Sequence, residues 1–192
     1  MLYKKINGLQ IKNCFGLYPI DRKLYFAATV EIDERNGAPA GTLTHNITNS
    51  NMGSTDAVNL DPVAYPVTPG NNTFEKWQQL HVTAMGGSSK IDNLKIWRTG
   101  ALGGVATHKT NARTTVYGGA EVYAAPTASV SVYTQVMPTA VPASANLGIG
   151  GLLTGSLLVA GSSDYLIHQI QTNVADVAGS TSTMNYQYDE TA

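Results

Sequence analysis

Short segments in which apolar and other residues alternate constrain this chain more than any other feature. In LYFAATVEID (residues 24–33), the alternate residues Leu24, Phe26, Ala28, Val30 and Ile32 fall on one face of an extended strand. DERNGAPAG follows, and its Asn-Gly pair and proline favour a turn, so we expect the strand to end near residue 33. The pattern predicts a half-buried β-strand.

Similar segments recur along the chain, with turn residues between them, and no segment keeps a helical period. This arrangement predicts an all-β fold, an antiparallel β-sandwich that is jelly-roll-like and has long ordered loops. No repeat with a fixed period of about 20–50 residues is visible, which argues against a propeller or a solenoid. The further strand candidates are residues 73–85, 91–97, 114–125, 128–137, 152–161, 164–174 and 182–190.

The stretch TFEKWQQLHVTAMGGSSKIDNLKIWRTG (residues 73–100) places one tryptophan on each of two neighbouring strand candidates. Alternation puts Trp77 and Trp97 on the mixed, less hydrophobic faces, where an indole ring can be half exposed and still donate a hydrogen bond. The two segments are expected to form a hairpin or to be adjacent strands across a corner. A helix beginning at Thr73 is the alternative for the first segment.

The 192 residues suit one ordinary domain or one domain with an arm. We predict an N-terminal arm or edge strand over residues 1–22 and a β-sandwich domain over residues 23–192.

Residues 1–20 lack a continuous apolar core and a convincing cleavage site, so they do not resemble a signal peptide. No apolar stretch reaches the roughly 18–20 residues of a membrane span. The single cysteine, Cys14, cannot form an internal disulfide, which favours folding in the cytoplasm.

Charged residues make up only 13% of the chain, about half of the roughly 25% usual in soluble domains. The net charge is -1 and no basic run exceeds Lys4-Lys5, so nucleic acid and membrane are not expected as partners. A surface of small polar and amide side chains has a modest desolvation cost when another protein covers it. The composition therefore favours a subunit of a permanent assembly, with copies of itself as partners.

Residues 42–72 form a long polar stretch that contains Pro62, Pro66 and Pro69. Prolines discourage a central strand, and loops of this length are often functional or form interfaces. An irregular crossover between sheets is the alternative.

Protein interfaces are enriched in aromatic residues, so the aromatic side chains of this chain supply the remaining contact candidates. The predicted contact residues are Trp77, Trp97, Tyr133, Pro62, Tyr65 and Pro66; in a carbohydrate-binding module, Trp77, Trp97, Tyr117, Tyr123 and Tyr133 would instead stack on sugars.

The sequence contains no motif that announces catalysis, so no enzyme and no cofactor is predicted. His45, His81, His108 and His168 stand singly, and none lies at i+2 or i+4 from another histidine or from the cysteine, so spacing does not support a metal site. A nucleophile elbow and a glycine-rich phosphate loop are also missing. A glycosidase would need two carboxylates that converge in a cleft, which the sequence does not reveal.

The chain resembles structural proteins of tailed-bacteriophage virions. The resemblance covers roughly residues 24–190 and rests on residues 73–100, on the loops AGTLTHNITNSNMGS and DPVAYPVTPGNNTF, and on the ending DYLIHQIQTNVADVAGSTSTMNYQYDET. It implies a non-enzymatic virion protein that folds in the host cytoplasm, most simply a capsid decoration or cement subunit that contacts other virion proteins such as a major capsid protein. A neck, baseplate or tail subunit and a carbohydrate- or receptor-binding module of a tail fibre are the alternatives.

Overall fold

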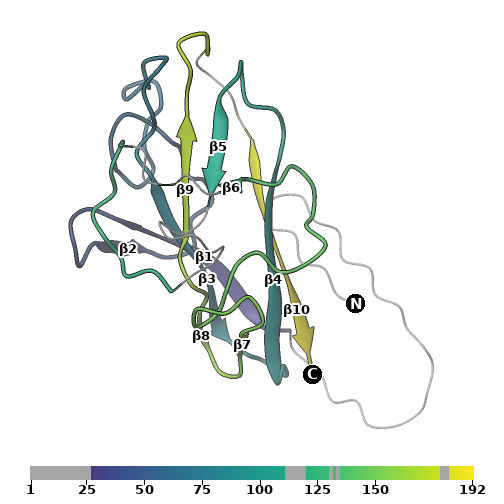
Figure 1. The fold of residues 1–192 in the computed structure, drawn as a ribbon. Helices are drawn as coiled ribbons and strands as arrows, with labels where there is room; N and C mark the ends of the chain where they lie inside the picture. The colour runs from purple at the N-terminus through teal and green to yellow at the C-terminus, as the bar shows by residue number, and fades with distance from the viewer. Residues whose placement is uncertain (1–26, 111–119, 130–131, 133–134, 178–181) are drawn as a thin grey trace.

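The computed structural model describes residues 27–110, 120–129, 132, 135–177 and 182–192, and within these ranges the fold is all-β, without a helix (Figure 1). The all-β, antiparallel prediction is therefore confirmed. Residues 1–22, Cys14, Tyr117 and Tyr133 lie outside the described ranges. The strands are β1 (Thr29–Asn36), β2 (Thr42–Thr44), β3 (Lys76–Ala84), β4 (Lys90–Thr99), β5 (Thr107–Thr110), β6 (Gln135–Val136), β7 (Ser156–Leu157), β8 (Gly161–Ser162), β9 (Leu166–Gln171) and β10 (Thr183–Thr191).

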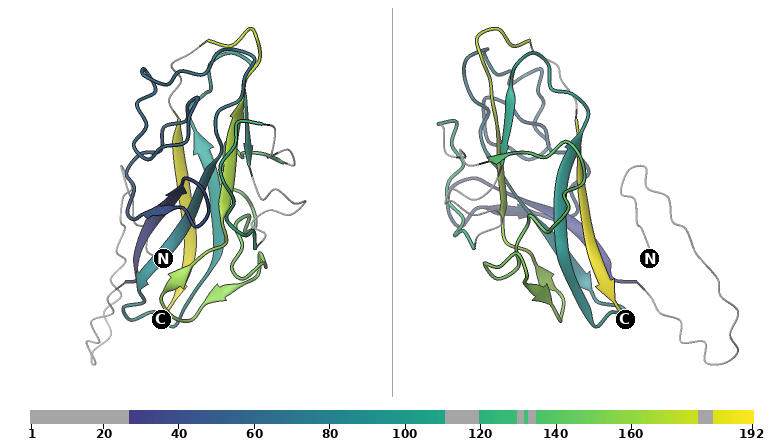
Figure 2. Two further views of the ribbon diagram at one scale, coloured as in Figure 1. Left: turned by 90° about the vertical axis from the view of Figure 1, so that its left-hand side faces the viewer. Right: turned by 45° about the vertical axis from the view of Figure 1, so that its right-hand side comes forward.

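The strands form two sheets. The larger sheet has the order β2-β1-β3-β9-β5-β6, with β8 also paired to β3, and the smaller sheet has the order β10-β4-β7. In Figure 2 the long strands β4 and β10 lie beside the larger sheet, and β7 and β8 lie at one end of the molecule. Strands of the larger sheet separate β4, β7 and β10 of the smaller sheet along the chain, so both sheets depend on contacts between distant parts of the chain.

One hydrophobic cluster contains side chains from both sheets. Val30 from β1 and Leu80 and Val82 from β3 meet Leu94 and Ile96 from β4. All five are at most 7% exposed. Their alternation along each strand is the period of two that the sequence displays, and burial of this apolar surface is the main force that holds the sheets together. Met184, Tyr186 and Tyr188 of β10 pack on the same cluster, as their alternation predicts.

A bulge in β4 interrupts this period. Asp92 pairs with Asp189 and Lys95 with Gln187, so two residues of β4 stand opposite Tyr188 alone. Asn93 takes a positive φ of 50° at this point, a conformation that asparagine tolerates better than most residues. The extra residue allows Ile91 and Leu94, three positions apart, both to face the core.

The connection between β3 and β4 does not form a hairpin. The two strands belong to different sheets, and residues 85–89 carry the chain from one sheet to the other. Of the two expected arrangements, the hairpin is therefore wrong, and the strands lie across a corner. The helix considered for residues 73–85 is also wrong, because residues 76–84 form β3.

Other strand boundaries differ from the expectation. β1 continues to Asn36 rather than ending near residue 33, because Glu34 and Asn36 are buried and hydrogen-bonded. β5 lies in a stretch that contains none of the strand candidates. Residues 120–125 contain no strand, and residues 42–72 form an irregular excursion apart from β2. In these places hydrogen bonding to distant segments overrides local alternation.

Candidate functional site

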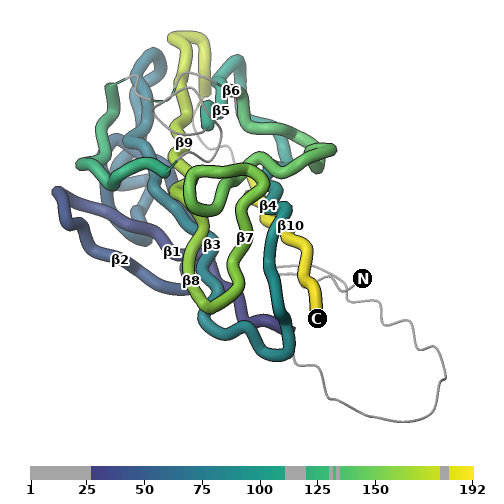
Figure 3. Tube along the Cα trace, turned by 60° about the horizontal axis from the view of Figure 1, so that its bottom comes forward, coloured from purple at the N-terminus to yellow at the C-terminus, as the bar shows by residue number. Residues whose placement is uncertain are grey.

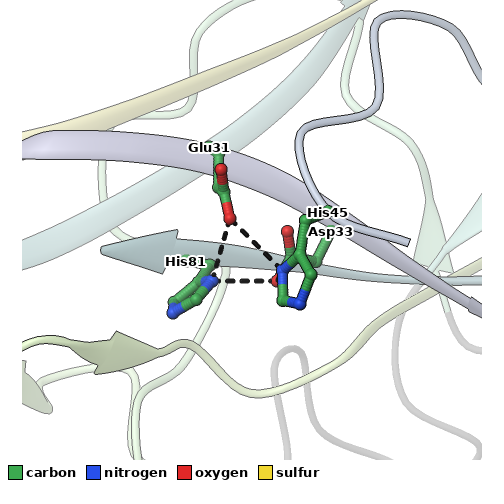
Figure 4. Close-up of side chains that lie close together, drawn as sticks. All are labelled: Glu31, Asp33, His45 and His81. Carbon is green, nitrogen blue, oxygen red and sulfur yellow. Dashed lines mark hydrogen bonds and ion pairs between the residues drawn. The ribbon is translucent and has the colours of Figure 1, made fainter. Parts of the chain in front are cut away.

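Four side chains of types that can ligate a metal meet on the outer face of the larger sheet, at β1, at β3 and just after β2 (Figure 4). Glu31 and Asp33 are two residues apart on β1, so both point away from the core. The backbone register places His81 of β3 directly opposite Glu31. On the other side of β1, Glu34 pairs with Thr44, and His45 follows at once. Three adjacent segments therefore contribute to one cluster, which we call the His-carboxylate cluster.

The ligand atoms of the His-carboxylate cluster are close together. The Nδ1 atom of His45 lies 2.9 Å from Asp33 Oδ2 and 3.3 Å from Glu31 Oε1. The Nδ1 atom of His81 lies 2.9 Å and 3.2 Å from the same two oxygens. All four atoms lie within 4.8 Å of one another. Two nitrogens and two oxygens thus alternate around one point.

The cluster is partly shielded from solvent. Asp33 is 2% exposed and Glu31 is 19% exposed, whereas His45 is 56% exposed. The backbone N–H of Asn46 donates to Asp33 Oδ1 at 3.3 Å, which leaves Oδ2 to the two imidazoles. A buried carboxylate needs compensating positive charge or hydrogen bonds. In the described part of the chain, no lysine or arginine forms an ion pair with Glu31 or Asp33.

Sequence reasoning missed this cluster because it compared histidines only with other histidines and with the cysteine. Its ligands come from β1, from β3 and from the residue after β2, so they are far apart in the chain. The available signal was the pair Glu31 and Asp33 on the polar face of a clear strand, with His81 on the mixed face of another. Only the strand register, which the sequence does not display, joins them.

Trp77 is completely buried, so the expectation that its ring is half exposed is wrong. Its indole packs edge-on against Tyr123 and Tyr165, with ring centroids 5.1 Å and 5.3 Å apart. Val132 joins the same cluster and helps to cover this face of the sheet. The indole N–H donates to Glu75 Oε1 at 3.1 Å. Trp77 therefore holds a covering segment on the sheet and offers no surface to a partner in this conformation.

The predicted contact residues do not form one patch. Trp97 is half-buried and points away from the side of β4 that carries Leu94 and Ile96. Trp77 likewise lies on the face of its sheet opposite Leu80, so the two tryptophans are on opposite outer faces. Pro62, Tyr65 and Pro66 are exposed on the excursion, with Tyr65 at 48%. Tyr133 is outside the described ranges.

A buried polar network occupies the inner face next to the apolar core. Glu34 and Lys76 are each 1% exposed, and the Lys76 ammonium donates to Glu34 Oε1 at 2.9 Å. Gln78 donates to Glu34 Oε2 at 3.0 Å, Asn36 donates to Oε1 at 3.2 Å, and the Ser50 hydroxyl also donates to this carboxylate. Because every member has partners within the fold, this network is structural.

A second pair of histidines is buried between β5 and β9. His108 Nε2 lies 2.9 Å from His168 Nδ1, and both residues are at most 3% exposed. Burial, with the nearby Lys76 ammonium as the smaller cause, lowers the pKa of His168 to about 3. Burial is the main cause that lowers the pKa of His108 well below its usual range, and the neighbouring His168 acts in the same direction. Both imidazoles are therefore neutral near pH 7.

Exposed apolar side chains occur at several places on the molecule, and two pairs of them lie at opposite ends. Around β7 and β8, Leu158 is 65% exposed and Val159 is 71% exposed (Figure 3). At the opposite end, the loops before β5 and after β9 carry Val105 and Val174, which are 64% and 82% exposed (Figure 1). The backbone N–H of Val105 donates to Asp176, which ties these two loops together. We call these two regions the β7–β8 end and the β5–β9 end.

An open hollow of about 420 Å³ lies between the excursion and residues 128–129. Its lining contains neither an aromatic ring nor a charged side chain, so it offers no stacking platform for a sugar and no acid pair for hydrolysis. The His-carboxylate cluster is not part of it. The lining residues are Ser54, Val67, Thr68, Gly70, Asn71, Asn72, Ala128 and Ser129.

Comparisons with known proteins found no matching family model, no similar curated protein and no similar solved structure. Within the described ranges, no helix is both long and apolar enough to cross a membrane.

Proposed function

We propose that this chain is a non-enzymatic structural subunit of a bacteriophage virion, and specifically a capsid decoration or cement subunit that acts through protein–protein contacts. The observation that carries the proposal is the pair of exposed apolar ends. Scattered exposed apolar residues are normal, but groups of them mark interaction sites. Two such groups at opposite ends suit a subunit that bridges two neighbours in a shell.

The proposed architecture is a β-sandwich with a jelly-roll-like arrangement. Its support is the larger hydrophobic cluster, to which both sheets contribute. The proposed partners are copies of the chain and other virion proteins such as a major capsid protein, with assembly after folding in the host cytoplasm. A standard contact buries about 800 Å² per partner, and repetition around a shell makes loss of one subunit rare.

The direct test is to purify particles of the virus that encodes this chain and to locate the chain by cryo-electron microscopy. We expect regularly placed copies on the head, and heads that lack the chain should release their DNA at a lower temperature. Placement in the neck, baseplate or tail would favour the alternative structural roles. Absence of the chain from purified particles would refute a virion role.

Leu158→Asp tests whether the β7–β8 end is a contact surface. Leu158 is 65% exposed, so the substitution should leave the fold intact while it places a charge in the contact. We expect the variant to bind chain-free particles much more weakly than the parent chain in a co-sedimentation assay. Val122→Asp is the matched control, because Val122 is an 86% exposed valine that belongs to neither end. Equal binding by Leu158→Asp and the parent would remove this end from the interface.

A carbohydrate- or receptor-binding module remains the second candidate. Trp97 is the observation in its favour, because its half-buried ring faces away from the core. A glycan array, followed by titration of the parent chain and of Trp97→Ala, separates the two candidates. Sugar binding that is lost in Trp97→Ala would replace the structural proposal, whereas no binding would support it.

A further inference from the structure

We propose that Glu31, Asp33, His45 and His81 bind one divalent transition-metal ion, with Zn²⁺ as the preferred ion, in a structural rather than a catalytic site. The proposal is independent of the virion role, since a metal site at this position would exist whatever the chain assembles with. The four side chains come from β1, β3 and the residue after β2 (Figure 4).

The distances within the cluster suit such an ion. Zinc lies about 2.0–2.2 Å from imidazole nitrogen and carboxylate oxygen, so neighbouring ligands of a tetrahedral site are about 3.3–3.6 Å apart, slightly farther than the nitrogen and oxygen atoms lie here. The four nitrogen–oxygen distances here are 2.9, 2.9, 3.2 and 3.3 Å. The remaining pairs lie within 4.8 Å. Small rotations of these side chains, of which His45 is the most exposed, would bring the four atoms onto one ion.

The geometry of His81 is a second, independent indication. Its Nδ1 atom is buried and lies 2.9 Å from Asp33 Oδ2, yet it makes no hydrogen bond with any described residue. The proton or lone pair of Nδ1 lies in the plane of the imidazole ring. It therefore does not point at Asp33 Oδ2 or at Glu31 Oε1, although both oxygens are close. A buried polar atom without a partner is costly, and a metal ion in front of the lone pair would satisfy it.

Charge gives a third reason. Glu31 and Asp33 bring two negative charges to one face of β1, and Asp33 is almost completely buried. Arg35 is the next residue on that face, but its guanidinium donates to the Ala40 carbonyl and lies 5.5 Å from the ring centre of Tyr123. A divalent cation would neutralise the two carboxylates that this arginine leaves uncompensated.

The donor types select the class of metal. Calcium and magnesium prefer sites made of oxygen atoms, whereas two imidazoles with two carboxylates suit zinc and its neighbours in the first transition row. Four protein ligands fill a tetrahedral shell and leave no position for a reacting water, which is the pattern of structural zinc sites. The site is therefore expected to stabilise the fold without catalysing a reaction.

Metal binding would fix the start of the excursion. His45 is the first residue after β2, and Ile47 then donates a backbone hydrogen bond to Ile32 on β1. A bond from the ion to His45 would hold this segment against β1 and β3 at once. Exposed Tyr65 lies farther along the same irregular segment, residues 42–72. The ion would therefore also restrict the motion of the segment that carries Tyr65.

The experiment begins with the full chain stripped by a chelator and dialysed into metal-free buffer. Titration calorimetry with ZnCl₂, with elemental analysis of the reloaded protein, should give one zinc per chain and little or no response to CaCl₂. At a zinc concentration about 100 times the dissociation constant, the unfolding midpoint should rise by roughly 5–10 °C. No zinc binding by the folded chain would overturn the proposal.

The variant His45→Ala tests the ligand set with little risk to the fold, because this side chain is 56% exposed. It should bind zinc at least about tenfold more weakly and lose most of the zinc-dependent rise in the unfolding midpoint. Asp92→Asn is the matched control, since Asp92 is a partly exposed carboxylate on β4 in the other sheet. His45→Ala with unchanged zinc affinity would refute the assignment, and unchanged circular dichroism would show that both variants are folded.

Discussion

Removal of Lys76 from its buried pair with Glu34 should cost more stability than removal of Lys90 from its exposed pair with Asp92, and Lys76→Met tests this. The substitution keeps the length and apolar stem of the side chain but removes the ammonium that donates to Glu34 Oε1 at 2.9 Å and to the Ala57 carbonyl at 2.7 Å. Glu34 would keep only neutral donors around a buried negative charge.

The expected magnitude follows from burial. Both side chains are 1% exposed, and removal of one partner from a buried ion pair typically costs about 3–5 kcal/mol because the other charge stays buried without compensation. Domains are stable by roughly 5–15 kcal/mol, so this loss is a large fraction of the total. For a chain of this length it corresponds to a fall of about 6–20 °C in the unfolding midpoint.

Guanidinium unfolding followed by circular dichroism measures the effect. Lys90→Met is the matched control, because Lys90 pairs with Asp92 at 2.7 Å but the two side chains are 40% and 26% exposed. Exposed pairs contribute about 0–1 kcal/mol, so this control should be close to the parent chain.

The double variant Glu34→Gln/Lys76→Met sharpens the test. It removes the buried charge along with its partner and retains an amide oxygen that can accept a hydrogen bond from Gln78. We therefore expect it to be more stable than Lys76→Met alone. If Lys76→Met costs less than about 1 kcal/mol, as Lys90→Met should, or if the second substitution adds to the loss, the reasoning from burial is refuted.

Three further predictions concern other parts of the fold. The pKa of His168 is lowered in the folded chain, so this residue binds a proton readily only when the chain is unfolded. The free energy of unfolding should therefore decrease as pH falls below 6.5, by about 2 kcal/mol at pH 5 from this residue. Guanidinium unfolding at pH 7.5 and 5 measures the decrease, and an equal decrease in His168→Gln would contradict the assignment. Gly41→Ala should lower the thermal unfolding midpoint more than Gly37→Ala does. Both glycines have positive φ, but only at Gly41 would an added Cβ meet the Tyr123 ring, at 2.5 Å. Equal losses in the two variants would contradict the clash. Trp77→Ala should cost about 3–5 kcal/mol in the same assay, whereas a loss under 1 kcal/mol would show that the ring is not packed as described.

The core could be predicted from the sequence where one face of a strand is purely apolar. Val30 in β1 and Leu80 and Val82 in β3 lie where alternation placed them. Tyr186 and Tyr188 of β10 also followed the pattern. The assignment failed where polar side chains are buried, as at Glu34, because a local pattern does not reveal a hydrogen-bonded partner 42 residues away.

The candidate sites depended on information that a single sequence does not contain. Trp77 looked half exposed because its strand face is mixed, but the segment that carries Tyr123 folds over it from more than 40 residues away. The His-carboxylate cluster arises from strand register, and a shift of one residue between β1 and β3 would turn His81 to the other face. Long-range pairing therefore decides both outcomes.

The low charge of the chain has a sharper meaning once burial is known. The sequence has only 12 basic and 13 acidic residues, and several of them are removed from the surface by the fold. Those buried in the described ranges are Asp33, Glu34, Glu75, Lys76, Asp164 and Asp176. The solvent-facing surface therefore carries fewer charges than the composition suggests, and less charge must be desolvated when a neighbour covers it. Several charged side chains and the polar groups that hydrogen-bond to them lie inside the fold, while apolar side chains such as Leu158 and Val174 are exposed and available for contacts. This distribution supports the proposal of an assembled subunit.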